Sequence, residues 1–343
     1  MRGTSRLIAG IVFAAMLSAT PALAQIVAGP GTCVPEVHAA PEAQIADCSA
    51  VIRSGQGNLD VLSVALTVRG NAYAATGDLD RALKDLDEAI RINPKSAISY
   101  SVRGAIHGRR KEHDAAIADY SAAIKLAPTL PGAYNDRAIS YIAKGEWDRA
   151  IADCTEAVKL NAKFAGAYNN RGIAYSNKVE IDKAIADYSE AIKLNYAYVN
   201  ALNNRGGAYV AKGDYARAIA DYATAIKYQP TDSAAFSGRC WAHALAGQPK
   251  TALADCDELI RLKPDDGNGF ALRGFAYLKL ADYDHAIDDY GMALWFTPKH
   301  ALALYGRGFA RLKKGDKGGN DDIAEAKALR RDVAELFVKY GVK

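Results

Sequence analysis

An arginine recurs every 34 residues along most of this chain, with no insertion or deletion between one occurrence and the next. The eight arginines are Arg69, Arg103, Arg137, Arg171, Arg205, Arg239, Arg273 and Arg307. A fixed period of this length is typical of a repeat protein in which each repeat is a helical hairpin too small to bury its own apolar face. We therefore expect the repeats to stack into an all-α solenoid, which presents an extended surface for binding.

Other positions of the repeat carry residues that suit close helix packing. With repeats counted from Ser63, position 8 is mostly glycine, position 20 is alanine in seven repeats, and positions 11 and 24 are mostly tyrosine. Glycines such as Gly77 and prolines such as Pro94 fall where the first and the second helix of a repeat should end. We expect the tyrosines to fill the core between hairpins.

These residues together resemble the tetratricopeptide repeat (TPR) family, whose pattern matches seven repeats from Ser63 to His300. The resemblance implies a right-handed superhelix of about eight helical hairpins with an N-terminal half-repeat helix and a C-terminal capping helix. The expected organisation is a signal peptide at 1–24, an N-terminal cap segment at 25–62, seven repeats at 63–300, and at 301–343 a degenerate eighth repeat followed by the capping helix. The family pattern breaks down at Gly318-Gly319-Asn320.

The start of the chain predicts export. Arg2 and Arg6 precede an apolar run at 7–17, and the sequence then reads Pro21-Ala22-Leu23-Ala24. This arrangement is typical of a secretory signal peptide cleaved after Ala24, although an uncleaved membrane anchor is the alternative. Since no later run approaches the ~18 apolar residues of a membrane span, we expect a soluble mature chain that is periplasmic or secreted.

A row of aspartates accompanies the arginines. Its members are Asp47, Asp85, Asp119, Asp153, Asp187, Asp221, Asp255 and Asp289. Each precedes one arginine, so we expect each aspartate to accept hydrogen bonds from the arginine of the next repeat and to fix the stacking of adjacent hairpins. The alternative is that the arginines line the binding surface for an anionic ligand.

The five cysteines agree with an oxidising compartment. Cys33 and Cys48 are candidates for a disulfide that ties down the N-terminal cap. Cys240 and Cys256 face each other within one hairpin and are a second candidate pair, with two buried free thiols as the alternative. Cys154 remains, and its aromatic core position predicts a buried free thiol.

Catalysis, cofactors and nucleic acid are not indicated. The sequence contains no phosphate-binding glycine loop, nucleophile elbow or zinc-ligand spacing. Its 43 lysines and arginines and 39 aspartates and glutamates are mixed along the chain, which does not suit binding to a polyanion. We therefore expect a protein that is not an enzyme and that holds neither a cofactor nor a metal.

The resemblance places positions 2, 5, 6, 9, 12 and 13 of each first helix on the concave groove. In the middle repeats these positions carry polar residues, which are Asn135, Asp136, Asn169, Asn170, Asn200, Asn203 and Asn204, beside Ile139 and Ile173. An asparagine amide both donates and accepts hydrogen bonds, so this row suits the backbone of an extended peptide. The alternative is that the asparagines serve only solubility.

The groove positions become aromatic toward the C-terminus. Trp241 and Phe275 form either a second, apolar subsite or a cluster that packs within itself and against the cap. Trp295 and Phe296, on a second helix, are expected in the core.

The sequence thus predicts a noncatalytic periplasmic scaffold that binds extended segments of other proteins, and we expect these partners to be cell-envelope proteins. The alternative function is regulation of cell-envelope enzymes through glycan or peptidoglycan contact, with Trp241 and Phe275 as a stacking platform.

Overall fold

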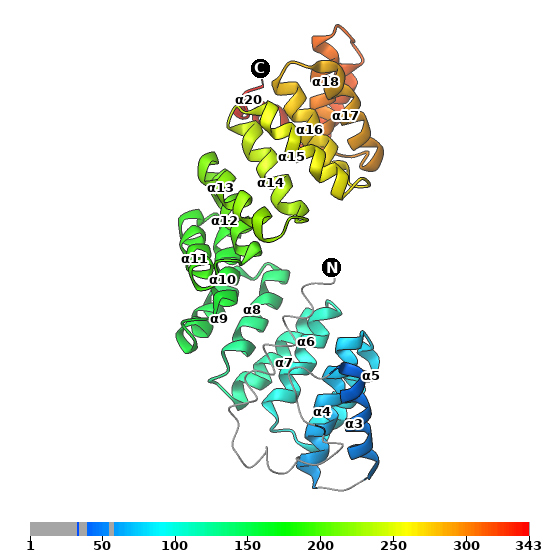
Figure 1. The fold of residues 1–343 in the computed structure, drawn as a ribbon, viewed down its shortest axis with the longest axis vertical. Helices are drawn as coiled ribbons and strands as arrows, with labels where there is room; N and C mark the ends of the chain where they lie inside the picture. The colour runs from blue at the N-terminus through cyan, green and yellow to red at the C-terminus, as the bar shows by residue number, and fades with distance from the viewer. Residues whose placement is uncertain (1–32, 34–39, 55–57, 343) are drawn as a thin grey trace. The chain divides into compact units, whose positions relative to one another are not determined.

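The computed structural model describes residues 33, 40–54 and 58–342. The predicted signal peptide lies outside these residues. The described residues form eighteen α-helices and no strand, which confirms the all-α prediction (Figure 1). The helices are α3 (Pro41–Ser54), α4 (Leu59–Thr76), α5 (Leu79–Ile92), α6 (Ala97–Arg109), α7 (His113–Leu126), α8 (Pro131–Lys144), α9 (Trp147–Leu160), α10 (Ala165–Asn177), α11 (Ile181–Leu194), α12 (Val199–Lys212), α13 (Tyr215–Tyr228), α14 (Ser233–Leu245), α15 (Pro249–Leu262), α16 (Gly267–Lys279), α17 (Tyr283–Phe296), α18 (Ala301–Lys313), α19 (Gly319–Leu329) and α20 (Val333–Lys339).

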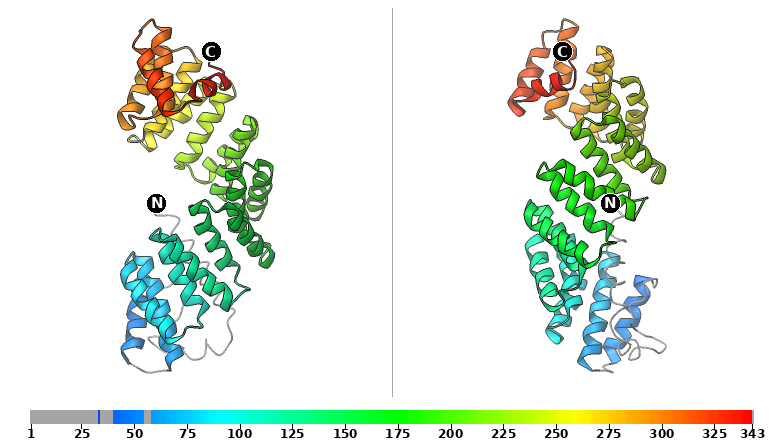
Figure 2. Two further views of the ribbon diagram at one scale, coloured as in Figure 1. Left: turned by 180° about the vertical axis from the view of Figure 1, so that it is seen from behind. Right: turned by 90° about the vertical axis from the view of Figure 1, so that its left-hand side faces the viewer.

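The chain divides into two compact units, residues 1–178 and 179–343. The first contains α3 to α10 and the second contains α11 to α20. Within each unit, consecutive helices pack against one another as antiparallel hairpins, and each hairpin packs on the next (Figures 1 and 2). None of the helices in the described residues is both long enough and apolar enough to cross a membrane.

Small residues and tyrosines build the core of each hairpin, as the repeat pattern predicts. The alanines at position 20 are fully buried, and so are the aromatic rings at position 24 such as Tyr120 and Tyr290. The tyrosines at position 11 are mostly half-buried instead, and arginines of the second helix cover the rings of Tyr73, Tyr141 and Tyr209. The guanidinium of Arg81, for example, lies 4.6 Å from the ring centre of Tyr73.

In every repeat, the residue at position 15, just after the first helix, has the left-handed backbone conformation. Five of these residues are glycines, which adopt a positive φ without steric cost: Gly77, Gly145, Gly213, Gly247 and Gly315. The other three repeats place a residue with a side chain there, and Lys111, Val179 and Ala281 have φ angles of 63°, 63° and 59°. A left-handed conformation costs such residues about 1–2 kcal/mol.

We expect Val179→Gly and Ala281→Gly each to stabilise the protein by about 1 kcal/mol, because glycine removes the steric cost at the end of the helix. Gly77→Ala should destabilise it by a similar amount. The measurement is the free energy of unfolding in urea. Gly108 is a control, since it lies inside α6 with no atom within 4 Å of an added Cβ, so Gly108→Ala should instead stabilise by up to ~1 kcal/mol. If all four variants changed in the same direction, backbone conformation would not be the cause.

The C-terminal segment contains two helices where the sequence predicts one capping helix. Gly318 and Gly319 do not interrupt the eighth repeat; α19 begins at Gly319 and packs on α18 as its second helix. Glycine is needed where α18 and α19 meet, because the two backbones are in contact. A Cβ on Gly308 would lie 2.6 Å from the carbonyl oxygen of Gly319. The cap is therefore the short helix α20 alone.

Candidate functional site

The arginine and aspartate rows pair within repeats. In each of the pairs given below, Nε and Nη2 of the arginine donate to the two carboxylate oxygens of an aspartate on the second helix of the same hairpin, at 2.7 Å and 2.7 Å for Arg137 and Asp153. The described pairs are Arg69 with Asp85, Arg103 with Asp119, Arg137 with Asp153, Arg205 with Asp221, Arg239 with Asp255, Arg273 with Asp289, and Arg307 with Asp322.

The prediction that each aspartate pairs with the next repeat is therefore wrong. The two helices of a hairpin are antiparallel, so positions 7 and 23 lie level with one another across the hairpin, whereas the preceding aspartate is one hairpin away. For the same reason Asp322, and not Asp47, completes the row. The aspartates are buried, with exposed fractions of 5–7%.

A contact between adjacent repeats does exist, through the third nitrogen of the guanidinium. Nη1 of Arg137 donates to Ser121 Oγ on the preceding second helix at 2.9 Å, and Nη1 of Arg103 donates to Asp87 at 2.7 Å. The partner is position 25 of the preceding repeat, which sequence reasoning missed because its residue type varies. Hydrogen bonds to Asp119 and Asp87 raise the pKa of Arg103 above its usual value. These arginines therefore fix structure.

In the first unit, the polar residues of the predicted groove form a chain of hydrogen bonds between α8 and α10. The Asn170 side-chain amide donates to Asn135 Oδ1 at 2.9 Å, and the Asn135 amide donates to Asp136 Oδ1 at 3.0 Å. Asn135 and Asn169 are themselves buried. They orient Asp136 and Asn170, which stay partly exposed. Ile139, beside them on α8, is 40% exposed.

Burial changes the protonation of the Asp136 carboxyl group. Desolvation raises the pKa of Asp136 to about 6, and the hydrogen bond from Asn135 opposes that increase. The carboxyl group is therefore mainly a hydrogen-bond acceptor at neutral pH and carries a proton below about pH 6.

The second unit holds the remaining asparagines on α12. Asn200 is exposed, and the Asn203 amide donates to Asp232 Oδ2 at 2.6 Å. Asp232 also caps α14 by accepting from the Ala234 backbone N–H at 3.1 Å. The buried Oδ1 of Asn203 has no hydrogen-bond partner among the described residues. Asn203 therefore connects adjacent first helices, as Asn135 and Asn170 do in the first unit.

Two tyrosines of the second unit pass between first helices where glycine leaves room. A Cβ on Gly238 would lie 2.3 Å from Cζ of Tyr222, and a Cβ on Gly306 would lie 2.3 Å from Cζ of Tyr290. Both glycines occupy position 6, which the family resemblance places on the groove. The ring of the preceding second helix thus fills the space of a groove side chain. The sequence alone predicted only a core position for these tyrosines. Glycine at position 6 of the following repeat was the signal that their rings reach the groove.

The C-terminal aromatic residues pack against the cap. Phe275 is 4% exposed, and its ring centre lies 4.9 Å from that of Trp241 and 6.0 Å from that of Phe337 in α20. Trp241 also meets Tyr340 edge-on at 5.0 Å. Of the two interpretations of these residues, the structure favours internal packing for Phe275, while Trp241 remains partly exposed.

The expectation of a core position for Trp295 is wrong. This side chain on α17 is 73% exposed, and its ring meets that of the neighbouring Phe296 edge-on.

The cysteines are placed as the sequence predicts. Cys33 and Cys48 form a disulfide with Cα atoms 4.6 Å apart, and Cys240 and Cys256 form another with Cα atoms 5.6 Å apart. Cys154 is buried and takes part in neither disulfide.

Comparisons with known proteins agree with this architecture. Family models described as tetratricopeptide repeat match residues 67–131, 203–267 and 165–195. A tetratricopeptide repeat protein from Parabacteroides merdae is 21% identical, with a TM-score of 0.56 over 72% of this chain and 98% of its own. A chain of the Cut9–Hcn1 hetero-tetramer of the APC/C is 16% identical, with a TM-score of 0.58. The match covers 87% of this chain and 59% of that chain. PilF of Pseudomonas aeruginosa is 18% identical, with a TM-score of 0.51. The match covers 61% of this chain and 97% of PilF.

No curated protein matches the chain significantly. The stacked helical hairpins define an α-solenoid, and the repeat matches specify which kind. The chain contains tetratricopeptide repeats. Proteins with these repeats are generally noncatalytic scaffolds that bind other proteins, which supports the same general role here.

Proposed function

We propose that this protein holds extended peptide segments of other proteins on the face formed by groove positions of its first helices, hereafter the groove face. The observation that carries the proposal is the hydrogen-bonded chain from Asn170 through Asn135 to Asp136. It fixes polar groups in advance, so that little side-chain entropy is lost when a peptide backbone binds. Exposed Ile139 next to the chain supplies apolar area for a peptide side chain.

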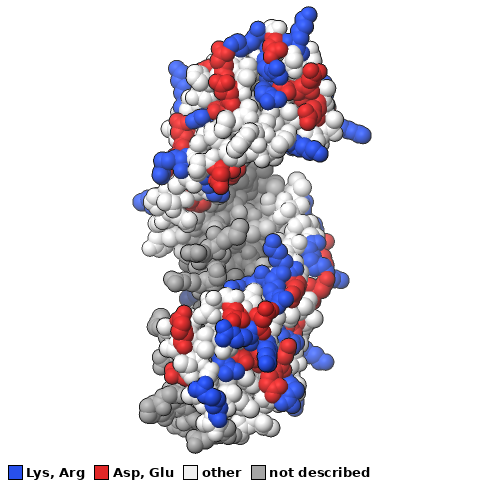
Figure 3. Space-filling model, turned by 90° about the vertical axis from the view of Figure 1, so that its right-hand side faces the viewer, with Lys and Arg blue, Asp and Glu red and all other residues white. Residues whose placement is uncertain are grey.

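We also propose that the protein is exported and that its partners belong to the cell envelope. The two disulfides support an oxidising compartment. Charges of both signs are mixed in the upper and the lower part of the view in Figure 3, which suits protein partners better than a polyanion. Mass measurement of the chain recovered from the periplasm would test cleavage after Ala24.

Glycan contact through stacked rings receives less support. A stacking platform needs accessible ring faces, and Phe275 is covered by Trp241, Phe337 and Tyr340.

Selection from a random peptide display library tests peptide binding directly. We expect peptides selected on the wild type to lose at least about tenfold in affinity with Ile139→Glu, since a charge would replace apolar contact area. Leu160→Glu is the matched control, because Leu160 on α9 is 38% exposed and lies on a second helix. Fluorescence anisotropy gives both affinities. Equal loss in the two variants, or selected peptides that bind both normally, would contradict a groove-face receptor.

The pH dependence tests the role of Asp136. If its carboxylate accepts a peptide N–H, affinity should fall between pH 7.5 and 5, as the group with a pKa of about 6 takes up a proton, and Asp136→Asn should remove that dependence. Destabilisation of the fold by protonation of Asp136 does not explain such a loss of affinity. A raised pKa means that the folded state favours the protonated form, so this group's contribution to stability is largest below about pH 4 and decreases as the pH rises through 6.

A further inference from the structure

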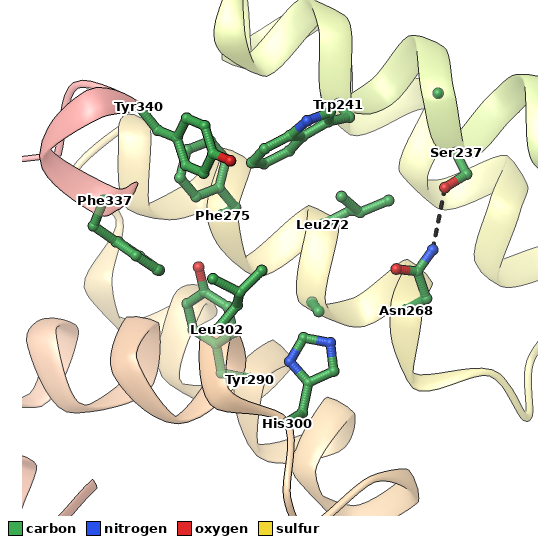
Figure 4. A pocket seen from close by; sticks show the side chains of 12 residues that line it. Ser237, Trp241, Asn268, Leu272, Phe275, Tyr290, His300, Leu302, Phe337 and Tyr340 are labelled. Carbon is green, nitrogen blue, oxygen red and sulfur yellow. Dashed lines mark hydrogen bonds between the residues drawn. The ribbon is translucent and has the colours of Figure 1, made fainter. Parts of the chain in front are cut away.

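A pocket lies at the C-terminal end of the groove face, among α14, α16, α18 and the segment around α20. Its volume is about 290 Å³, and its walls include Trp241, Leu272, Phe275, Leu302 and Phe337 (Figure 4). None of the residues that line it is charged. The cap therefore does more than cover the last repeat, since it completes one wall of an apolar pocket.

Tyr290 brings a hydroxyl group to this pocket. Its ring, 1% exposed, rises from α17 between Gly274 and Gly306, and Figure 4 shows the hydroxyl directed toward Leu302 and Phe337. This buried oxygen has no hydrogen-bond partner among the described residues. A buried hydroxyl without a partner is unfavourable because its lost hydration is not replaced, and a ligand that supplied the partner would recover that free energy.

His300 supplies a second polar group with a defined role. The Ala303 backbone N–H donates to its Nδ1 at 3.1 Å, so Nδ1 carries no proton. Burial lowers the pKa of His300, which leaves the ring neutral at pH 7 with its proton on Nε2. The pocket thus offers the N–H of His300 and the hydroxyl of Tyr290, beside the polar side chains of Ser237, Asn268 and Tyr340; the Asn268 amide donates to Ser237 Oγ at 3.1 Å. A ligand that matches His300 and Tyr290 must carry an oxygen that accepts.

Size and polarity then select the ligand. A cavity of 150 Å³ holds benzene, so about 290 Å³ accommodates a substituted ring. A charged group would be desolvated there without a counter-charge, at large cost. A phenylalanine side chain would leave Tyr290 unsatisfied, whereas a phenol both accepts and donates.

We propose that this pocket binds the side chain of a tyrosine in a protein partner. The inference rests on the proposed peptide binding for its biological source, but the pocket can be tested without any peptide. p-Cresol and toluene are the side-chain analogues of tyrosine and phenylalanine, and they differ only in the hydroxyl group.

Trp241 provides the measurement, because it lines the pocket. The chain has three tryptophans, so Trp147→Phe and Trp295→Phe leave Trp241 as the only one, and its emission reports occupancy of the pocket. In this background we expect saturable binding of both compounds, with p-cresol bound about tenfold more tightly than toluene. Tyr290→Phe should reduce that ratio about fivefold, the value of one hydrogen bond, without lowering the melting temperature, since it removes an unsatisfied group.

Tyr120→Phe is the matched control. It removes a hydroxyl at the same position of an earlier repeat, where the ring is 3% exposed and belongs to the first unit, outside the residues that line this pocket, and should leave the ratio unchanged. Absence of saturable binding would refute the pocket. Equal affinities for the two compounds, or an unchanged ratio in Tyr290→Phe, would refute the assignment to tyrosine. If p-cresol binds as expected while no library peptide binds, the pocket stands and the peptide receptor fails.

Discussion

Asp153→Asn should destabilise the protein by about 3 kcal/mol, one of the two largest effects that we expect from a substitution. Asp153 is 6% exposed and accepts from both Nε and Nη2 of Arg137 at 2.7 Å. Loss of one partner of a buried pair leaves the other charge uncompensated, which costs about 3–5 kcal/mol, and the amide of asparagine retains part of the hydrogen bonding. The measurement is the free energy of unfolding in urea at pH 7.

Asp148→Asn on the same helix is the control for this prediction. Asp148 pairs with Lys178 at 2.5 Å but is 84% exposed, and exposed pairs contribute at most about 1 kcal/mol. The double variant Arg137→Met/Asp153→Leu should recover most of the stability, because apolar residues of suitable size often replace a buried pair at little cost. If Asp148→Asn and Asp153→Asn had equal effects, burial of the pair would not matter for stability.

The arginine row shows how far the sequence could predict this structure. The 34-residue period determined the number of hairpins and the alignment of the arginines, because one repeat is one packing unit. The period alone could not say whether an aspartate partner lies in the same hairpin or in the preceding one, since both choices recur with the same 34-residue period. The antiparallel geometry of the hairpin decides it, together with the Nη1 contact to residues such as Ser121.

The sequence predicted which positions form the groove face, but not which of their side chains are exposed. Positions 5 and 6 of the first helices carry Asn135 and Asp136, yet only the structure shows that Asn135 turns inward and holds its neighbour. The pocket near Tyr290 depends on the return of the C-terminal segment onto α14 and α16. Contacts such as the hydrogen bond from Lys279 Nζ to the Tyr340 carbonyl at 2.8 Å join parts of the chain that no repeat pattern relates.

Removal of the Cys33–Cys48 disulfide should cost about 3 kcal/mol, because the crosslink closes a loop with a sequence separation of 15 residues and thereby restricts the unfolded chain. Both cysteines are buried with Ala65 and Val68 at the first hairpin. A terminal repeat packs against only one neighbour, so we expect the loss to appear as early unfolding of α3 and α4. Hydrogen exchange of the amides in α4, compared between the wild type and Cys33→Ala/Cys48→Ala, measures it.

A double-mutant cycle separates the crosslink from the packing of the sulfur atoms. Each single change, Cys33→Ala or Cys48→Ala, already breaks the disulfide, so the double variant should be little less stable than either single variant. Reducing agent should bring the wild type close to the same stability while leaving the double variant's α4 exchange unchanged. Single effects that simply add would mean that the two sulfurs contribute only packing, and the N-terminal cap would then not depend on the redox state of its compartment.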